Sequence, residues 1–294
     1  MRSVTLTRMT IMKTPKLAAI SAAIFCLTAP ASAADIGQRM YTKAPPVTAA
    51  KSWTGFYVGA NVGYAWLDSH TSFSPNDGAS TFYTNFVGTP PVSFDHSGVT
   101  GGFQLGYNWQ VSDRWVLGLE ADLSLGDLKG SGASIATIAV PAVPFSTVAD
   151  SQIEWFSTIR ARLGYVATPD LLLFATGGLA IARVEQSARY NNLTGSSFIS
   201  NAIDGSSVLC ASFSTCFAGA SSDTNYGWTV GAGFEYALFG NFTLKAEYLY
   251  VRLEDNSFNV TATNSTAGFA PATFTADFGR TDFHTARLGV NYRF

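Results

Sequence analysis

Polar and apolar residues alternate strictly along the last twelve residues of the chain, 283–294. One face of an extended strand there would carry only apolar side chains: Leu288, Val290, Tyr292 and Phe294. The opposite face would carry Arg287, Gly289, Asn291 and Arg293. A soluble protein rarely turns two arginines of one strand toward its core, whereas a strand between lipid and a polar lumen needs this pattern. The pattern therefore predicts a membrane-spanning strand with its apolar face outward.

Seven further segments are predicted to be strands of the same kind: 53–66, 99–109, 115–125, 153–165, 171–183, 226–238 and 242–251. Most have about the 9 to 11 residues that a tilted membrane strand requires, with some overhang. Only 171–183 is apolar or small on both faces, so its periodicity does not orient it. The tryptophans all lie at strand ends, as aromatic girdles at the two membrane surfaces require: Trp53, Trp66, Trp109, Trp115, Trp155 and Trp228.

The connections between these segments alternate in length. Three are short turns, at 111–114, 167–170 and 240–241, and Gly240-Asn241 is a strong hairpin signal. Four are long, at 68–97, 126–151, 185–224 and 254–280. Outer-membrane barrels have short periplasmic turns and long extracellular loops. We therefore predict an all-β protein: an eight-stranded antiparallel up-and-down transmembrane β-barrel with four long extracellular loops and three short periplasmic turns.

The N-terminus predicts export. Lys13 and Lys16 precede an apolar stretch at 17–27, and Ala31-Ser32-Ala33 offers a cleavage site. We expect a signal peptide over 1–33, a periplasmic linker over 34–52 and an outer-membrane barrel domain over 53–294, with Met12 as an alternative start. The predicted location is therefore the cell outer membrane, reached through the periplasm.

Charge is scarce and slightly acidic. Charged residues make up 13% of the chain, about half the share of roughly 25% in soluble proteins. Without residues 1–33 the chain keeps 14 basic and 20 acidic residues, a net charge of −6. Nucleic-acid binding, which requires a basic face, is not expected.

Ten charged residues fall on the predicted lumenal face: Glu120, Asp122, Glu154, Arg160, Arg162, Glu235, Lys245, Glu247, Arg287 and Arg293. The interior of an eight-stranded barrel is just wide enough for side chains to fill. Because buried charges need partners and five acids face five bases, these groups are predicted to form a hydrogen-bonded plug. The alternative is a narrow ion path lined by the same residues.

Catalytic and cofactor signatures are weak. His70 and His96 lie in the first predicted loop and His284 on the last strand, without metal-ligand spacing. One hypothesis is that His70 or His96 ligates haem, and the alternative is that both are solvated histidines of a loop. His284 faces lipid, as a histidine does in barrel enzymes that act on lipid A, but the serine that marks the deacylases is Ala286 here. We expect no enzyme activity, no metal and no cofactor.

Cysteine usage predicts one bond. Cys26 leaves with the signal peptide, so Cys210 and Cys216 in the third long loop are the cysteines of the mature chain. The periplasm is oxidising, and a small loop-closing disulfide between them is expected.

Several pieces carry a resemblance: residues 53–66 (WTGFYVGANVGYAW), 101–110 (GGFQLGYNWQ), 174–180 (FATGGLA), 244–250 (LKAEYLY) and the terminal VNYRF. They are similar to the small porin-family or outer-membrane immunogenic protein barrels of alphaproteobacteria, over about half the chain. That resemblance implies an abundant, surface-exposed eight-stranded barrel, with links in the family to haem binding or envelope integrity. A terminal Phe after alternating apolar residues also resembles the strand that the barrel-assembly machinery reads, here Leu288, Val290, Tyr292 and Phe294.

The predicted function is that of an integral outer-membrane barrel, an immunogen-like protein with a structural and surface-interaction role. Its alternatives are a small diffusion channel, a porin, and a haem- or ligand-binding surface receptor. Expected partners are outer-membrane lipid, the barrel-assembly machinery and an unidentified extracellular ligand bound through the loops, and the protein is expected to be a monomer.

Overall fold

The computed structural model describes residues 52–139 and 142–294. The predicted signal peptide and all but the last residue of the predicted linker lie outside the described residues. The elements are β1 (Gly55–Pro75), α1 (Gly78–Val87), β2 (Val92–Gln110), β3 (Trp115–Ala139), β4 (Ala142–Thr168), β5 (Leu171–Asn192), β6 (Phe198–Asn201), β7 (Ser206–Cys210), β8 (Thr215–Ala237), β9 (Phe242–Leu253), β10 (Ser257–Ala262), β11 (Ala270–Pro271), β12 (Thr273–Asp277) and β13 (Thr281–Arg293).

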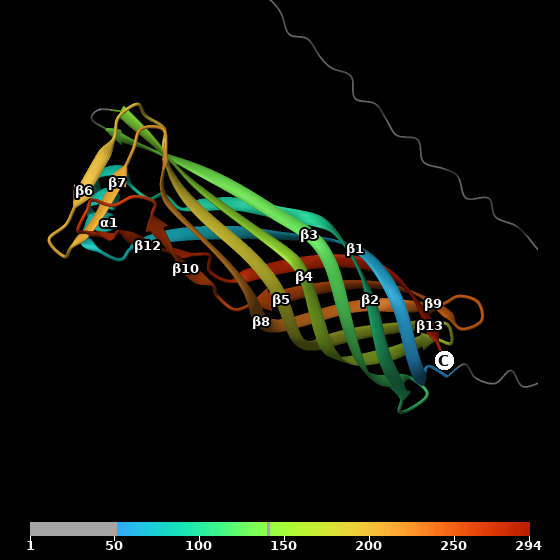
Figure 1. Cartoon of the computed structure of the whole chain (residues 1–294). Coiled ribbons are helices and arrows are strands. Elements are labelled where there is room, and N and C mark those ends of the chain that lie inside the picture. Colours follow the sequence, from blue (N-terminus) through green and yellow to red (C-terminus); the bar gives the residue numbers. More distant parts are fainter. Residues whose placement is uncertain (1–51, 140–141) are drawn as a thin grey trace, which may run out of the picture. The chain divides into compact units, whose positions relative to one another are not determined.

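The long strands form one antiparallel sheet, so the predicted all-β antiparallel class is confirmed (Figure 1). Neighbours pair in the order β1, β2, β3, β4, β5, β8, β9 and β13. β13 then pairs back onto β1, where Val58 lies opposite Tyr292. In the described part of the chain, no helix has the length and apolar character that crossing a membrane would take.

The strands run much farther than predicted. β3 extends to Ala139 and β4 begins at Ala142, so the expected loop at 126–151 is largely strand. The other three predicted loops likewise contain extensions of β1, β2, β5 and β8, the short strands β6, β7 and β10 to β12, and the helix α1. Gly and Ser are frequent in these stretches and are typical of loops. The ladder continues because their inward side chains bury an apolar core.

The apolar face of a strand changes side along its length. In β1, Phe56 and Val62 face outward and are 65% and 57% exposed, and this outward apolar row ends at Trp66. Beyond that point Leu67 and Phe73 face inward and are buried. No bulge interrupts the pairing of β1 with β2 from Gly55 to Thr71. The outward surface of β1 is therefore apolar, as contact with lipid requires, near the end of the sheet that holds the C-terminus. Farther along the strand the apolar side chains face inward, as contact of the outer face with water requires.

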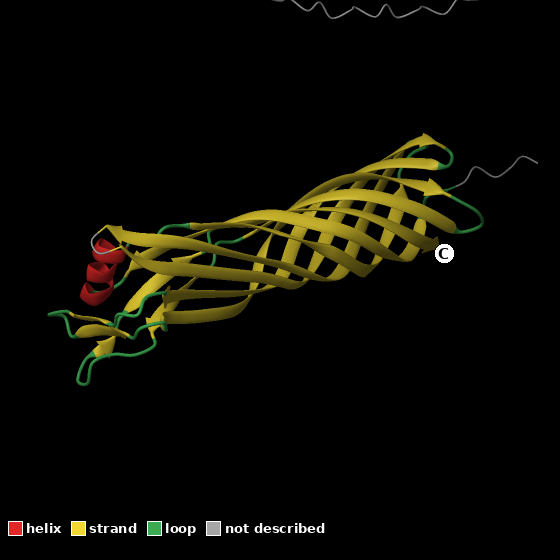
Figure 2. Ribbon diagram, turned by 90° about the horizontal axis from the view of Figure 1, so that it is seen from above, coloured by secondary structure: helices red, strands yellow, loops and turns green. Residues whose placement is uncertain are grey.

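The far end of the sheet has its own aromatic core. Tyr83 of α1 meets Phe217 and Phe145 edge to face, with ring centroids 5.3 and 5.6 Å away. The Asp77 carboxylate caps α1 by accepting the Ser80 amide at 2.8 Å, and it also accepts the Thr273 amide at 2.6 Å. α1, β6 and β7 lie at the opposite end from the C-terminus (Figure 2).

Two apolar layers lie inside the part of the sheet that carries the outward apolar belt. The basal layer, beside the C-terminal end, consists of Trp53, Val116, Leu172 and Ala237. The middle layer consists of Ala65, Leu67, Leu128, Ile153, Phe156, Ala180, Ala182, Val184, Leu249, Val251, Leu253 and Phe283. Every member of both layers is at most 4% exposed. The inward positions between the two layers hold the charged residues described next.

Candidate functional site

Eight charged side chains point into the interior between the basal and middle layers. Each is at most 4% exposed, and we call the set the charge network: Glu120, Asp122, Arg160, Arg162, Glu235, Lys245, Glu247 and Arg287. They alternate with outward apolar residues on β3, β4, β8, β9 and β13. Because side chains of a strand alternate between its two faces, the same alternation gives the sheet an apolar outer face and a charged inner face.

Arg160 is the centre of the network. Its Nη1 donates to Glu247 Oε1 at 2.6 Å, and its Nη2 donates to Asp122 Oδ2 at 2.8 Å and to Glu120. Glu120 lies directly opposite Arg160 on the neighbouring strand, whereas Glu247 comes from β9. One guanidinium therefore joins carboxylates of β3 and β9, and such charge-assisted bonds are the strong ones in proteins.

Two further cations close the same group. Lys245 Nζ donates to both oxygens of Glu120, at 2.6 and 2.7 Å, and lies 3.1 Å from Glu247. Arg287 donates from Nε to Glu247 at 2.8 Å and from Nη1 and Nη2 to the two oxygens of Asp122 at 3.1 Å each. Each of these three carboxylates is thus shared by at least two cations.

A second centre lies nearer the basal layer. Arg162 Nη2 donates to Glu235 Oε2 at 2.5 Å, and its guanidinium stacks on Phe174, 3.9 Å from the ring centroid. Thr243 and Asn291 donate to the other oxygen of Glu235 at 2.5 and 3.0 Å. The Tyr57 hydroxyl donates to Glu120 at 2.6 Å and links the two centres.

The positive and negative charges of the network balance. Its four carboxylates face three guanidiniums and one ammonium, and polar neighbours fill further acceptor positions. Among residues 52–139 and 142–294 there is no group of three or more His, Cys, Asp or Glu placed to hold a metal ion. The arrangement fits a cross-link inside the sheet.

Comparison with known proteins assigns the chain. The profile of the outer membrane protein beta-barrel domain matches residues 19–294. The 31 kDa outer-membrane immunogenic protein of Brucella melitensis is 35% identical over 293 residues, covering 96% of this chain and all of that protein. The chain belongs to the outer membrane beta-barrel family. It is a protein of the cell outer membrane, and the predicted family resemblance is confirmed.

The chain is also similar to one more distant sequence relative and to one solved structure. The 22 kDa outer membrane protein of Rhizobium leguminosarum bv. viciae is 27% identical, covering 85% of this chain and 82% of that protein. The crystal structure of OprG from Pseudomonas aeruginosa covers 82% of this chain and 97% of OprG, at 12% identity and a TM-score of 0.40. The assignment rests on the family profile and the sequence relatives, because the structural likeness is slight.

Two of the ten predicted lumenal charges of this family member lie elsewhere. Glu154 sits at a bulge where the register shifts between Ile153 and Trp155, so it turns outward and pairs with Arg183 at 3.2 Å. Arg293 lies beyond the basal layer, where it stacks on Trp53 with its Cζ 4.6 Å from the ring centroid and donates to the Ser52 carbonyl. A strict period of two cannot anticipate the bulge at Glu154.

Trp53 also departs from its predicted place. It is fully buried in the basal layer, whereas Trp66, Trp109, Trp115 and Trp228 are 38 to 60% exposed on the outside, as a girdle requires. Of the uncharged members of the site, only Asn291 was placed on an inward face from the sequence; Tyr57, Phe174 and Thr243 were not predicted. The available signal was their placement, since each lies an even number of residues from a network charge or belongs to an inward row.

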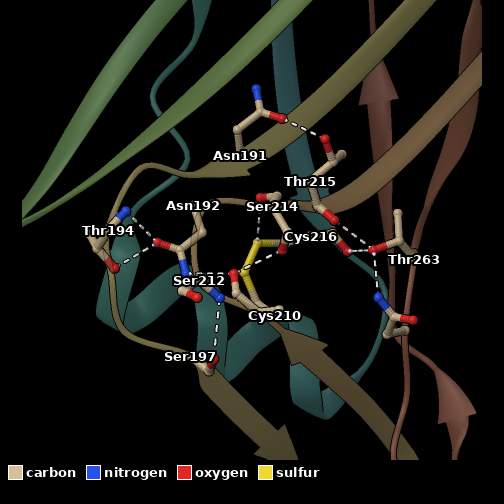
Figure 3. Close-up of a disulfide and its surroundings, with 12 residues drawn as sticks. Asn191, Asn192, Thr194, Ser197, Cys210, Ser212, Ser214, Thr215, Cys216 and Thr263 are labelled. Atoms are coloured by element: carbon tan, nitrogen blue, oxygen red, sulfur yellow. Dashed lines mark hydrogen bonds between the residues drawn. A yellow bond between two sulfur atoms is a disulfide. The ribbon is translucent and has the colours of Figure 1, made fainter.

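The predicted cysteine pair is joined in the structure. Cys210 at the end of β7 and Cys216 near the start of β8 form a disulfide with a Cα–Cα distance of 4.7 Å (Figure 3). Around it, Asn192 accepts from the Thr194 amide at 2.9 Å and donates to the Ala211 carbonyl at 3.0 Å. The disulfide and these bonds fix the connection between β7 and β8.

The three histidines do not share a site. His70 is exposed on the outward face of β1, whereas His96 on β2 is 1% exposed and faces inward. His284 faces outward on β13, and its Nδ1 lies 2.6 Å from the Tyr248 hydroxyl. The four residues of the predicted assembly signal also face outward, with exposed fractions of 57% for Leu288, 46% for Val290, 38% for Tyr292 and 73% for Phe294.

Proposed function

We propose that this protein is an eight-stranded up-and-down barrel that spans the outer membrane with a closed interior, and that it serves as a structural and surface-interaction component. The strands of the pairing cycle, β1 to β5, β8, β9 and β13, would be its staves. Their outward apolar belt, from Phe56 to Trp66 in β1, has the length of a membrane crossing.

Connection lengths support the orientation. The turns at 111–114, 169–170 and 238–241 lie at the end that holds the C-terminus (Figure 1). The long connections, with α1, β6 and β7, lie at the other end. Outer-membrane barrels place short turns in the periplasm, so the long end would face the cell exterior.

The observation that supports a closed interior is the charge network between the two apolar layers. The basal and middle layers lie on either side of it, and Arg160 and Glu120 have no exposed side-chain surface. An ion moving through would have to displace both apolar layers and separate ion pairs that are already desolvated. A filled interior requires no such displacement. It also accounts for the equal number of acidic and basic groups, because each buried charge needs a partner.

Exposed apolar residues at the long end support a surface-interaction role. Ile203 in the β6–β7 turn is fully exposed and Phe213 in the disulfide-closed loop is 74% exposed. Phe213 also adopts a positive φ of 49°, which is unfavourable for a non-glycine residue. The partner would be an extracellular molecule.

A solute-flux assay tests the closed interior. The folded protein is reconstituted into phosphatidylcholine vesicles, and swelling is followed in arabinose. We expect the swelling rate of protein-free vesicles, because the interior is filled. Swelling that rises in proportion to the protein content would support the diffusion channel instead.

Cysteine labelling tests the orientation. Ile203→Cys and Asp113→Cys are expressed in cells and treated with a membrane-impermeant maleimide. The native cysteines do not react, because they are joined to each other. Labelling of Ile203→Cys alone supports the proposed orientation, and labelling of Asp113→Cys alone reverses it.

A further inference from the structure

The outward surface of β8, β9, β13 and β1 carries a shallow furrow within the apolar belt. Its volume is about 700 Å³. Small side chains, among them Ala232, Ala246 and Ala286, line it together with the larger Val62, Phe234 and Tyr248. Three alanines, Ala232, Ala246 and Ala286, form its floor. We call this feature the alanine furrow.

A polar group lies directly at the end of the furrow that is farther from the C-terminus. It is built from three cross-strand pairs and Tyr248, and we call it the polar platform. The pairs are Trp66 with His284, Tyr250 with His284, and Arg252 with Asp282. Tyr248 belongs to both features. The platform therefore continues the furrow at the height where the outward apolar belt of β1 ends.

Hydrogen bonds hold the platform in one arrangement. Arg252 forms a bidentate pair with Asp282, with Nε–Oδ1 and Nη2–Oδ2 distances of 2.9 and 2.7 Å. The Tyr250 hydroxyl donates to Asp282 at 2.9 Å and accepts from Arg252 at 2.6 Å. Nothing in this network belongs to the barrel interior, so a structural plug does not explain it.

Aromatic rings complete the surface. The His284 ring stacks on Trp66 with centroids 5.8 Å apart and an interplanar angle of 21°, and it lies 5.9 Å from the Tyr248 ring. Trp66 and Tyr248 remain 38% and 45% exposed. Rings of this kind offer an apolar face beside polar edges, which suits the boundary between acyl chains and headgroups.

We propose that the alanine furrow and the polar platform bind one saccharide-headed membrane lipid. An acyl chain would lie along the furrow, and the sugar headgroup would rest on the rings of Trp66 and Tyr248 with its hydroxyls near His284 and the Arg252–Asp282 pair. This inference rests on the proposed orientation, in which the platform end of the furrow faces the outer leaflet, so the lipid would come from that leaflet.

Charge on the platform favours a sugar over a bare phosphate. Asp282 neutralises Arg252, and the nearby Arg280 lies 3.5 Å from Asp255. Glu254 adds one further acid beside them. With no excess of positive charge, the platform offers donors and acceptors to hydroxyl groups, whereas phosphate sites cluster Lys or Arg.

Native mass spectrometry tests the proposal on the folded full-length protein in mild detergent. Three probes are titrated separately: monogalactosyl diacylglycerol, which has a sugar and no phosphate, lipid A, which has both, and phosphatidylglycerol, which has only the phosphate. We expect one molecule of the galactolipid or of lipid A to be retained at concentrations about tenfold lower than phosphatidylglycerol. Retention of lipid A and phosphatidylglycerol without the galactolipid would mean phosphate recognition and would overturn the proposal.

Matched variants separate the two halves of the site. Ala246→Leu fills the furrow and should weaken galactolipid retention about tenfold, whereas Ala161→Leu, on the outward face of β4, should leave it unchanged. His284→Phe keeps the ring but removes its hydrogen bonds, so the preference for the galactolipid over phosphatidylglycerol should disappear. A gel shift between unheated and boiled samples verifies folding of each variant.

Two further results would overturn the proposal. Equal retention by the wild type, Ala246→Leu and Ala161→Leu would mean that the furrow holds no lipid. A dimer that Ala246→Leu abolishes would assign the furrow to a second copy of the chain. Both results leave the closed interior untouched, because the vesicle-swelling assay tests that feature separately.

Discussion

Arg160 on β4 donates to Glu247 on β9 at 2.6 Å, although β5 and β8 lie between these two strands in the sheet. The bond therefore crosses the interior instead of following the ladder. Arg160 also bonds Glu120 and Asp122 on β3. A single side chain thus joins segments that are far apart in the sequence, and the proposed closed interior requires cross-links of this kind.

Removing this guanidinium should destabilise the folded protein strongly. In Arg160→Ala, Glu120, Asp122 and Glu247 would keep their charges but lose a shared partner inside the barrel. Breaking a buried pair in this way costs about 3–5 kcal/mol. We expect urea unfolding in lipid vesicles to show a loss of that order in the free energy of unfolding.

An exposed pair provides the control. Arg189 lies 3.0 Å from Asp150, with the two side chains 52% and 36% exposed, and such pairs contribute about 0–1 kcal/mol. Arg189→Ala should therefore unfold close to the wild type. Equal losses in the two variants would show that the interior charges are solvated, which disagrees with a plug.

The part of the sheet just beyond the outward apolar row of β1, where His96 pairs with Leu67, should weaken in acid. Burial lowers the pKa of His96 from its ordinary value of 6.5 to about 4, while the Ser151 backbone and Asp95 oppose the shift. Because the folded pKa is the lower one, protonation favours the unfolded form. Stability contributed at this site is complete above about pH 6.5 and is lost as pH falls toward 4, by about 3 kcal/mol at most.

Hydrogen exchange at two pH values measures this effect. Amides of β2 and β3 around His96 should exchange faster at pH 4.5 than at pH 7, after correction for intrinsic rates. The variant His96→Leu should remove most of that difference. A pH dependence that survives unchanged in the variant would assign the acid response to other groups.

The disulfide should stabilise its loop without controlling assembly. Cys210 and Cys216 are only six residues apart in sequence, and closing a short loop restricts few unfolded conformations. In Cys210→Ser we expect normal outer-membrane levels and faster proteolysis between β7 and β8. Failure of the variant to reach the membrane would show that the bond is required earlier, during export or folding.

The terminal residue should matter for insertion. Phe294 faces outward and is 73% exposed, so its loss removes little packing, and a defect would point to recognition by the assembly machinery. Phe213 is 74% exposed in a loop and is the matched control. We expect deletion of Phe294 to lower outer-membrane levels, and deletion of Phe213 to leave them near normal. Equal levels would remove the terminal signal from the account.

Much of the sheet follows from the sequence because period-two alternation determines which side chains meet lipid and which meet the interior. Eight of the ten charges predicted to be lumenal, from Glu120 to Arg287, lie inside the sheet, since they belong to regular stretches of strand. The alternation misplaced Glu154, because a bulge inserts one residue and reverses the face. It could not orient 171–183, whose inward Phe174 is recognisable only from Arg162 stacked on it.

The far half of the sheet was not predicted for a different reason. There the apolar positions move from the outward to the inward face, as between Trp66 and Leu67. A search for outward apolar rows therefore ends each strand too early, and Gly- and Ser-rich stretches such as 126–151 are interpreted as loops. The helix α1 was also not predicted from the sequence, because its stability comes from the Asp77 cap and the packing of Tyr83 and not from a long amphipathic pattern.

Single-channel recording of the wild-type protein in planar lipid bilayers tests the central claim most directly. If Arg160, Glu247 and their partners close the interior between two apolar layers, as we propose, no steady openings are expected in molar salt at either polarity. Any brief, irregular currents are expected to equal those recorded in protein-free bilayers. Reproducible openings of one well-defined conductance, in a preparation whose gel shift verifies folding, would contradict the closed interior.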